Sequence, residues 1–224
     1  MDLQKNKDLV YEEVARAIHQ ANRPESSVAI VAVTKYVDSD TVAQLVDLGV
    51  QHIGENRVDK FLDKYEHLKD KNVTWHLIGT LQRRKVKEVI NLVDYFHALD
   101  SVKLAKEIQK RAQYPIKCFL QVNISGEESK HGFKPDELDE VLEELSSYDK
   151  LKIVGLMTMA PIDATERELN YIFKQTNDLR QSLKERNIKN MPFDDLSMGM
   201  SRDFPIAIQN GSTFVRIGTS FFRE

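Results

Sequence analysis

The stretch Val28-Ala29-Ile30-Val31-Ala32-Val33, followed by Thr34-Lys35-Tyr36, decides the fold of this chain. Its first six residues are all apolar, and no polar residue alternates with them. A strand that is buried on both faces has this pattern, and such strands are typical of a parallel sheet covered by helices. The pattern therefore predicts a buried parallel strand over residues 28–33.

Lys35 comes directly after this strand. We expect it at the C-terminal end of the strand, at the rim of a dry core. Loss of hydration disfavours the charged ammonium of a lysine in such a place, and the neutral amine is the form that attacks an aldehyde to make a Schiff base. The alternative is a lysine that only stretches from the strand end to water.

Length and composition bound the class of protein. The chain has 224 residues, 41% of them apolar, which predicts one sizeable core and a single domain covering residues 1–224. The formal net charge of -3 predicts no broad electrostatic footprint for nucleic acid or an anionic membrane. Cys118 is the only cysteine, so an internal disulfide is excluded, and its apolar surroundings predict a buried thiol. No apolar run approaches the roughly 20 residues that span a bilayer, and residues 1–7 lack a signal core, so a cytoplasmic protein is expected.

Segments with strand-like and helix-like apolar spacing alternate along the chain. Strands are expected at 28–33, 50–54, 73–79, 95–99, 116–122, 151–156, 195–197 and 213–217. Helices are expected at 8–21, about 40–48, from about 56, and then at 82–91, 101–113, 135–147, 164–186 and around 206–208. Asp38, Ser39 and Asp40 are candidate N-caps for the helix at about 40–48, Ser101 is a candidate N-cap for the helix at 101–113, and Pro135 fits the first turn of its helix.

This alternation has no Pro/Gly/Ser-rich linker to divide it. It favours an α/β protein with a single closed parallel (β/α)8 barrel of the TIM type over an open doubly wound sheet. The segment 195–197 is the weakest of the predicted strands. If it is not a strand, an open sheet remains the alternative.

In such barrels the site lies at the C-terminal ends of the strands, and phosphate often binds at the loops after strands seven and eight. This chain has Ser197-Met198-Gly199-Met200-Ser201 after the seventh strand and Gly218-Thr219-Ser220 after the eighth. Glycine lets backbone N–H groups approach an oxyanion, and hydroxyls donate further hydrogen bonds. The loops predict a phosphate site; the alternative is two ordinary tight turns.

Arg216 lies within the apolar eighth strand. A guanidinium there needs an acceptor, because an unpaired buried charge is costly. The acceptor is either a structural carboxylate or a heteroatom of a ligand at the mouth of the barrel.

Several motifs, taken together and in order, carry a family resemblance. They are Ala32-Val33-Thr34-Lys35, Gly54-Glu55-Asn56, Trp75-His76-Leu77-Ile78-Gly79-Thr80-Leu81-Gln82, Lys130-His131-Gly132-Phe133, Gly155-Leu156-Met157-Thr158-Met159, Leu196-Ser197-Met198-Gly199-Met200-Ser201 and Val215-Arg216-Ile217-Gly218-Thr219. The chain resembles the pyridoxal phosphate homeostasis proteins, relatives of the N-terminal barrel domain of alanine racemase, over almost its full length.

The resemblance implies a site for pyridoxal 5′-phosphate (PLP). It implies that Lys35 forms an aldimine with PLP and that Arg216 approaches the pyridine nitrogen, where a permanent cation would make the ring a weaker electron sink. It assigns the phosphate to Ser197, the backbone of Met200, Ser201, Gly218 and Thr219. It places Asn56, His76 and Met157 where they could line the cofactor, with a satisfied core histidine as the alternative for His76.

The resemblance also bears on whether the protein is an enzyme. The racemase relatives complete their site with a second domain and a tyrosine base opposite the lysine, whereas this sequence ends just after the eighth strand. A cofactor face open to water is unfavourable for carbanion chemistry. We therefore expect a non-catalytic, monomeric PLP binder that buffers PLP and passes it to client apoenzymes. The alternative is a racemase-like enzyme with Tyr36 as base, although neighbouring residues on a strand point to opposite faces.

Two other functions stay open at this point. One is a barrel that binds a sugar phosphate without a Schiff base. The other is a nucleic-acid patch formed by Arg83, Arg84, Lys85 and Lys87, for which the alternative is a solvated helix face interrupted by Glu88. The acidic helix near residues 136–144 is expected to be a solvent face that could dock a client enzyme.

Overall fold

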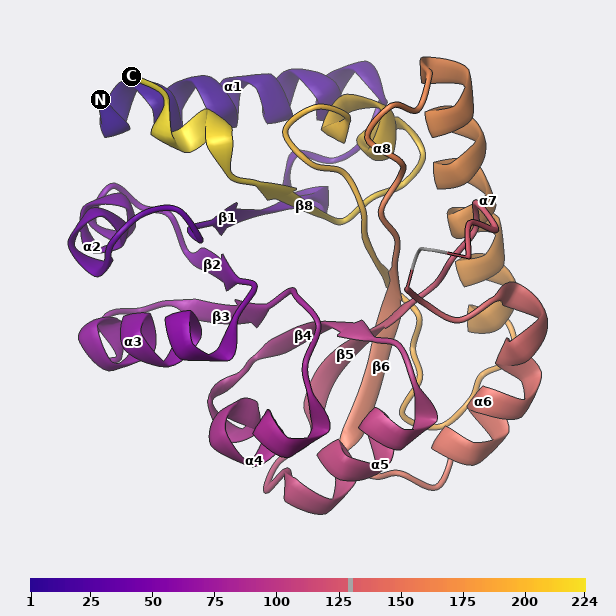
Figure 1. Cartoon of the computed structure of the whole chain (residues 1–224). Helices are drawn as coiled ribbons and strands as arrows, with labels where there is room; N and C mark the ends of the chain where they lie inside the picture. Colours follow the sequence, from indigo (N-terminus) through magenta and orange to yellow (C-terminus); the bar gives the residue numbers. More distant parts are fainter. Residues whose placement is uncertain (129–130) are drawn as a thin grey trace.

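The computed structural model describes residues 1–128 and 131–224 and shows a closed parallel barrel. The strands follow one another in sequence order, and β8 pairs back onto β1 (Figure 1). The strands are β1 Ala29–Val33, β2 His52–Glu55, β3 Thr74–Leu77, β4 Tyr95–Leu99, β5 Ile116–Gln121, β6 Leu151–Met157, β7 Asp195–Ser197 and β8 Phe214–Ile217. The predicted barrel is confirmed, and the open sheet is excluded.

Helices surround the barrel between successive strands. The α-helices are α1 Leu3–Gln20, α2 Ser39–Asp47, α3 Val58–Leu68, α4 Val86–Val89, α5 Val102–Arg111, α6 Leu138–Leu145, α7 Glu166–Lys184 and α8 Phe204–Gln209. Short 3-10 helices are η1 Glu25–Ser27, η2 Arg83–Lys85, η3 Ile90–Leu92, η4 Pro135–Glu137 and η5 Thr219–Phe222. Asp38 and Ser101 cap α2 and α5 through their side chains, as predicted.

The segment 82–91 differs from its prediction as one helix. It consists of η2, the single-turn helix α4 and η3. Val86, Val89 and Ile90 are β-branched and fully buried, so tertiary packing holds them while their stiff side chains lower the helix propensity. Here packing against the barrel decides the backbone, and local periodicity does not.

Gly155 allows the short strand β7 to join the barrel. A Cβ at Gly155 would lie 1.7 Å from the carbonyl oxygen of Asp195, so only glycine fits between β6 and β7. β7 then pairs with β6 from Asp195 to Ser197 and touches β8 at Phe214. The three-residue strand that looked weakest in the sequence is therefore held by close backbone approach.

The core has the composition expected from the sequence. Cys118 is fully buried on β5, and burial raises the pKa of its thiol well above the usual range. Over the described residues, no helix is both long enough and apolar enough to cross a bilayer. Of the motif Lys130-His131-Gly132-Phe133, the first residue lies outside the described residues.

Candidate functional site

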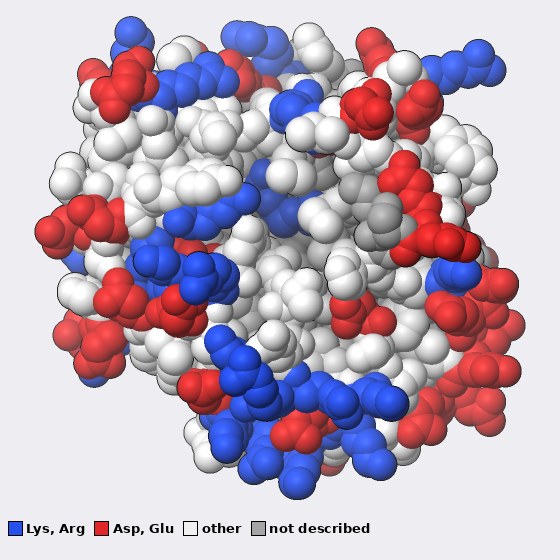
Figure 2. Space-filling view, viewed as in Figure 1, with Lys and Arg blue, Asp and Glu red and all other residues white. Residues whose placement is uncertain are grey.

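The carboxyl ends of the strands meet around one mouth of the barrel. In Figure 1 the units follow one another counter-clockwise, as right-handed β-α-β units do when viewed from the C-terminal ends of their strands, so this view faces that mouth. Figure 2 shows the same face as a space-filling surface, hollowed near its middle, with Lys or Arg side chains in the depth of the hollow. The mouth is thus a basic depression on a molecule whose net charge is -3.

Lys35 lies at this mouth but not in the strand. β1 ends at Val33, and Lys35 and Tyr36 form an exposed turn, closed by a hydrogen bond from the N–H of Val37 to the carbonyl of Thr34 (3.3 Å). The expectation that burial would dehydrate Lys35 is therefore wrong. Lys35 Nζ lies 4.9 Å from the centre of the Tyr36 ring, so the two side chains share one side of the turn. The strand-alternation argument against Tyr36 fails for the same reason.

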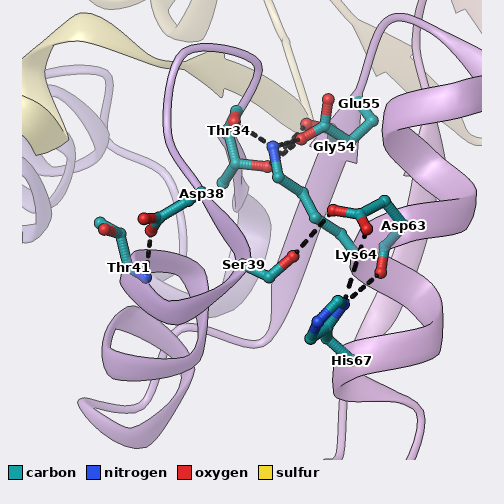
Figure 3. A network of polar contacts seen from close by, with 9 residues as sticks. All are labelled: Thr34, Asp38, Ser39, Thr41, Gly54, Glu55, Asp63, Lys64 and His67. Atoms are coloured by element: carbon teal, nitrogen blue, oxygen red, sulfur yellow. Dashed lines mark hydrogen bonds and ion pairs between the residues drawn. The ribbon is translucent and has the colours of Figure 1, made fainter.

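The buried lysine at this end of the barrel is Lys64, on α3. Its Nζ donates to the carbonyl oxygen of Thr34 (2.5 Å) and to Oε1 of Glu55, at the end of β2 (Figure 3). The Thr34 hydroxyl also donates to Glu55 Oε1 (2.6 Å), and both Lys64 and Glu55 are almost fully buried. The hydrogen bonds from Lys64 and to Glu55 hold Thr34 in place, immediately before the exposed turn that contains Lys35.

Sequence reasoning missed Lys64, although a signal was present. The buried face of α3 comprises Val58, Phe61, Lys64 and Leu68, so a lysine stands on the apolar stripe of an amphipathic helix. A charge in such a place must be paired, and Glu55 at the end of an apolar strand is its partner.

The loops after β7 and β8 are brought together as predicted. The backbone N–H of Gly218 donates to the Ser201 hydroxyl (3.4 Å), and the N–H of Arg216 donates to the carbonyl of Gly199 (2.9 Å). The backbone N–H of Met200 donates to Asp203 Oδ1 (2.7 Å), and its assignment to a phosphate stays a prediction. Ser201 and Gly218 are half-buried and Thr219 is exposed, which leaves these three residues accessible from the mouth.

Arg216 lies beneath these loops and is only 5% exposed. Its Nη1 donates to the Ser197 hydroxyl (2.5 Å), and its Nη2 donates to the carbonyl of Thr158 (3.2 Å). Desolvation lowers the pKa of Arg216 to about 10, while the nearby carboxylate of Asp203 acts in the opposite direction. Within the described part of the chain it has no carboxylate at ion-pair distance, so the neutral partners hold a guanidinium that stays charged at neutral pH.

Three of the expected site residues lie below the mouth. Ser197 is fully buried, and its hydroxyl bonds Arg216 and His97 Nδ1 (2.7 Å), so it supports the cation, while its assignment to the phosphate stays a prediction. His76 is fully buried, with its ring nitrogens bonded to His52 (2.9 Å) and His97 (2.8 Å), so the core alternative is the correct one. Met157 is 1% exposed and belongs to the core.

Asn56 lies at the rim as expected. It follows β2, is half-buried, and its backbone abuts Gly79, whose Cβ would be 2.3 Å from the Asn56 carbonyl oxygen. The close approach joins the loops after β2 and β3 at the mouth.

The basic residues at 83–87 lie away from the mouth. Arg83, Arg84 and Lys87 are exposed, and Figure 2 shows Lys and Arg side chains gathered over α4 and α5. Glu88 and Glu107 interleave with them, as on a solvated helix face.

The fold and the mouth together define a parallel (β/α)8 barrel with its ligand site at the C-terminal ends of the strands. The family description "Alanine racemase, N-terminal domain" matches residues 11–223. A protein of Aquifex aeolicus named pyridoxal phosphate homeostasis protein is 38% identical over 218 residues, covering 96% of this chain and 95% of that relative. This chain belongs to the pyridoxal phosphate homeostasis protein family.

Solved structures agree with this assignment. PipY of Synechococcus elongatus PCC7942, solved with PLP bound, has a TM-score of 0.83 and 31% identity, covering 94% of this chain and 100% of PipY. A crystal structure of an unknown protein from Bifidobacterium adolescentis has a TM-score of 0.93 and 32% identity, covering 98% of this chain and 94% of that protein.

The buried ion pair gives the first prediction. Lys64→Met leaves the Glu55 carboxylate buried without a cation, so we expect the free energy of unfolding to fall by about 3–5 kcal/mol in urea titrations. The matched control is Lys60→Met, an exposed lysine on the same helix, which is expected to change it by less than about 0.5 kcal/mol. Equal effects of the two substitutions would contradict a structural role for the pair.

Proposed function

We propose that this protein is a non-catalytic PLP carrier that holds the cofactor as a Schiff base on Lys35 and contributes to intracellular PLP homeostasis. One observation carries the proposal: the mouth that presents Lys35 also holds the clasped loops of Ser201 and Gly218 above the buried cation of Arg216. Membership of a family in which PipY was solved with PLP bound supports the choice of ligand.

The residues at the mouth fit the chemical groups of PLP. Ser201, Gly218 and Thr219 are the accessible hydroxyls and backbone of the two loops, and such groups bind phosphate. A guanidinium has five N–H donors, and Arg216 commits Nη1 and Nη2 to one protein acceptor each, so it retains donors for a ring nitrogen. Lys35 would supply the amine for the aldehyde, with Asn56 at the rim beside it.

The same geometry favours a carrier over an enzyme. PLP serves enzymes as an electron sink, and the fixed charge of Arg216 opposes the ring protonation that strengthens this sink. Lys35 is exposed and Tyr36 is 76% exposed, so the lysine side of the mouth is open to water. Water is unfavourable for carbanion chemistry. A site built in this way binds the aldehyde reversibly and releases it by hydrolysis.

The proposal includes the handling of PLP between proteins. Because the mouth is open, PLP can pass from this carrier to client apoenzymes without first being released from a closed active site. We propose that the carrier acts as a cytoplasmic monomer. Sedimentation velocity checks the monomer, and a single species at twice the mass of the chain would contradict it.

Lys35→Ala is expected to abolish covalent attachment of PLP while the circular dichroism and unfolding midpoint stay unchanged, because the Lys35 side chain is exposed and its amine lies against the ring of Tyr36. The measurement is the visible Schiff-base absorbance of the PLP-loaded protein, and the loss of that absorbance after borohydride. Lys60→Ala, at another exposed lysine, is the control and retains the signal. Persistence of the signal in Lys35→Ala would show that another lysine carries PLP.

Arg216→Ala removes the cation beneath the loops. We expect the dissociation constant for PLP to rise by about tenfold or more, which corresponds to about 1.4 kcal/mol, and the absorbance maximum of the bound cofactor to shift. Fluorescence titration measures the first and spectrophotometry the second. Unchanged affinity together with an unchanged spectrum would remove Arg216 from the site.

The contact between Lys35 and Tyr36 supports one second candidate, a racemase-like enzyme in which Tyr36 is the base. The expected result for a carrier is no turnover when PLP-loaded protein is incubated with a panel of L- and D-amino acids and analysed by chiral chromatography. Turnover that disappears in Tyr36→Phe would establish the enzyme instead.

A further inference from the structure

Three histidines form a hydrogen-bonded chain through the interior of the barrel. Ser197 Oγ lies 2.7 Å from His97 Nδ1, His97 Nε2 lies 2.8 Å from His76 Nδ1, and His76 Nε2 lies 2.9 Å from His52 Nδ1. Arg216 bonds the same Ser197 hydroxyl. The function proposed above uses none of these three imidazoles, which we call the histidine chain.

The histidine chain links the two ends of the barrel. Ser197 is the last residue of β7, beneath the mouth, whereas His52 is the first residue of β2. His52 is half-buried and lines a cavity of about 390 Å3 between α1 and the N-terminal ends of β1 and β2. Tyr11, Glu25 and Gln51 also line this cavity. One end of the chain therefore meets the buried cation, and the other meets a cavity at the opposite end.

The register of the nitrogens couples the three rings. In each ring Nδ1 faces Ser197, and Nε2 of His97 and of His76 faces the next imidazole toward the cavity. A neutral imidazole has one donor and one acceptor, so the tautomer of one ring fixes the tautomer of the next. With the Ser197 hydrogen given to His97 Nδ1, every ring carries its hydrogen on Nε2.

Aromatic side chains pack around the histidine chain and shield it from water. Phe214 contacts all three rings, at 5.7–6.3 Å between centroids, while Phe119 stacks on His97 at 4.6 Å and Tyr95 stacks on His76 at 4.8 Å. Desolvation lowers the pKa of His76 and of His97 well below the usual histidine range, so both rings are neutral.

Charged groups flank the chain at both ends. Arg216 disfavours a proton on His97, Lys117 disfavours one on His76, and Asp94 favours one on His52. Glu25 lies on the wall of the cavity. Desolvation lowers the pKa of His52 as well, and the carboxylate of Asp94 opposes that shift, so over the described residues only His52, of the three rings, has a nearby charge that favours a proton.

We propose that His52, His76 and His97 are a proton relay that connects the Ser197 hydroxyl, below the mouth, to the cavity at the opposite end of the barrel. Arg216 Nη1 passes the proton of its hydrogen bond to Ser197 Oγ as the Ser197 hydrogen passes to His97 Nδ1, and the guanidine regains a proton from the mouth. The hydrogens on Nε2 of His97, His76 and His52 then move to His76 Nδ1, to His52 Nδ1 and to water. One proton enters and one leaves, and each imidazole ends neutral with its hydrogen on Nδ1. The reverse shift resets the chain.

The use of this relay rests on the proposed function. A ring nitrogen held against the Arg216 cation would be held unprotonated, and the relay would give its proton a route that does not cross the occupied mouth. The relay itself belongs to the protein without ligand, and it can be tested in the ligand-free protein.

The test is the exchange of the imidazole N–H hydrogens with solvent, measured by NMR on protein with 15N-labelled histidine. In His52→Gln the amide oxygen can still accept from His76 Nε2 but the side chain cannot pass a proton, so exchange at His76 and His97 is expected to slow by about tenfold or more. The control is His19→Gln, an exposed histidine on α1, which leaves both rates unchanged. Unchanged rates in His52→Gln would overturn the relay.

A second measurement does not depend on a variant. In wild-type protein we expect 15N–15N couplings across the two imidazole–imidazole hydrogen bonds, and the Nε2–H tautomer for both buried rings. Absence of the couplings, or a mixture of tautomers, would overturn the relay. Both results are obtained without PLP, so failure of the PLP proposal, seen as no Schiff-base absorbance in loaded wild-type protein, is distinguished from failure of the relay.

Discussion

The buried guanidinium of Arg216 is the constraint on which the site depends. A charge in a dry interior is costly unless hydrogen bonds compensate it, and here the partners are a hydroxyl and a carbonyl, with Asp203 acting only through space. The hydroxyl of Ser197 accepts from Arg216 through a lone pair and is also hydrogen-bonded to His97 Nδ1. The histidine chain thus extends the hydrogen-bonding environment of the cation across the barrel. A carboxylate in contact would neutralise the charge that the mouth offers to an anionic ligand.

Two lysines lie near the end of β1, and they differ in burial and in role. Lys64 is buried and paired with Glu55, and it holds the backbone of Thr34 in place. Lys35 follows Thr34 in an exposed turn, where its amine is free to react. Under the function we propose, rigid support beneath an exposed amine suits a carrier that binds an aldehyde and also releases it. An enzyme gains more from enclosing its cofactor, because exclusion of water strengthens the interactions that stabilise charge in the transition state.

The sequence predicted which loops meet at the mouth of the barrel, but not how deep the other expected residues lie. The loops of Ser201 and Gly218 meet as expected, since the carboxyl ends of consecutive parallel strands share one edge of the barrel. Ser197, His76 and the backbone of Met200 were expected at the ligand, but a motif does not show the depth of a residue in the barrel or which neighbour has already taken its hydrogen bond. Depth follows from the pleat and tilt of each strand, which are properties of the closed sheet.

The sequence by itself determined the closed barrel, its single core and the loops that line its mouth, because apolar periodicity and turn residues act over short stretches of chain. Only the tertiary structure decided which charges are buried. The Lys64–Glu55 pair joins residues on different elements, and the contact between His97 and Ser197 joins positions 100 residues apart. Contacts of that kind depend on how the barrel closes, and local sequence does not encode them residue by residue.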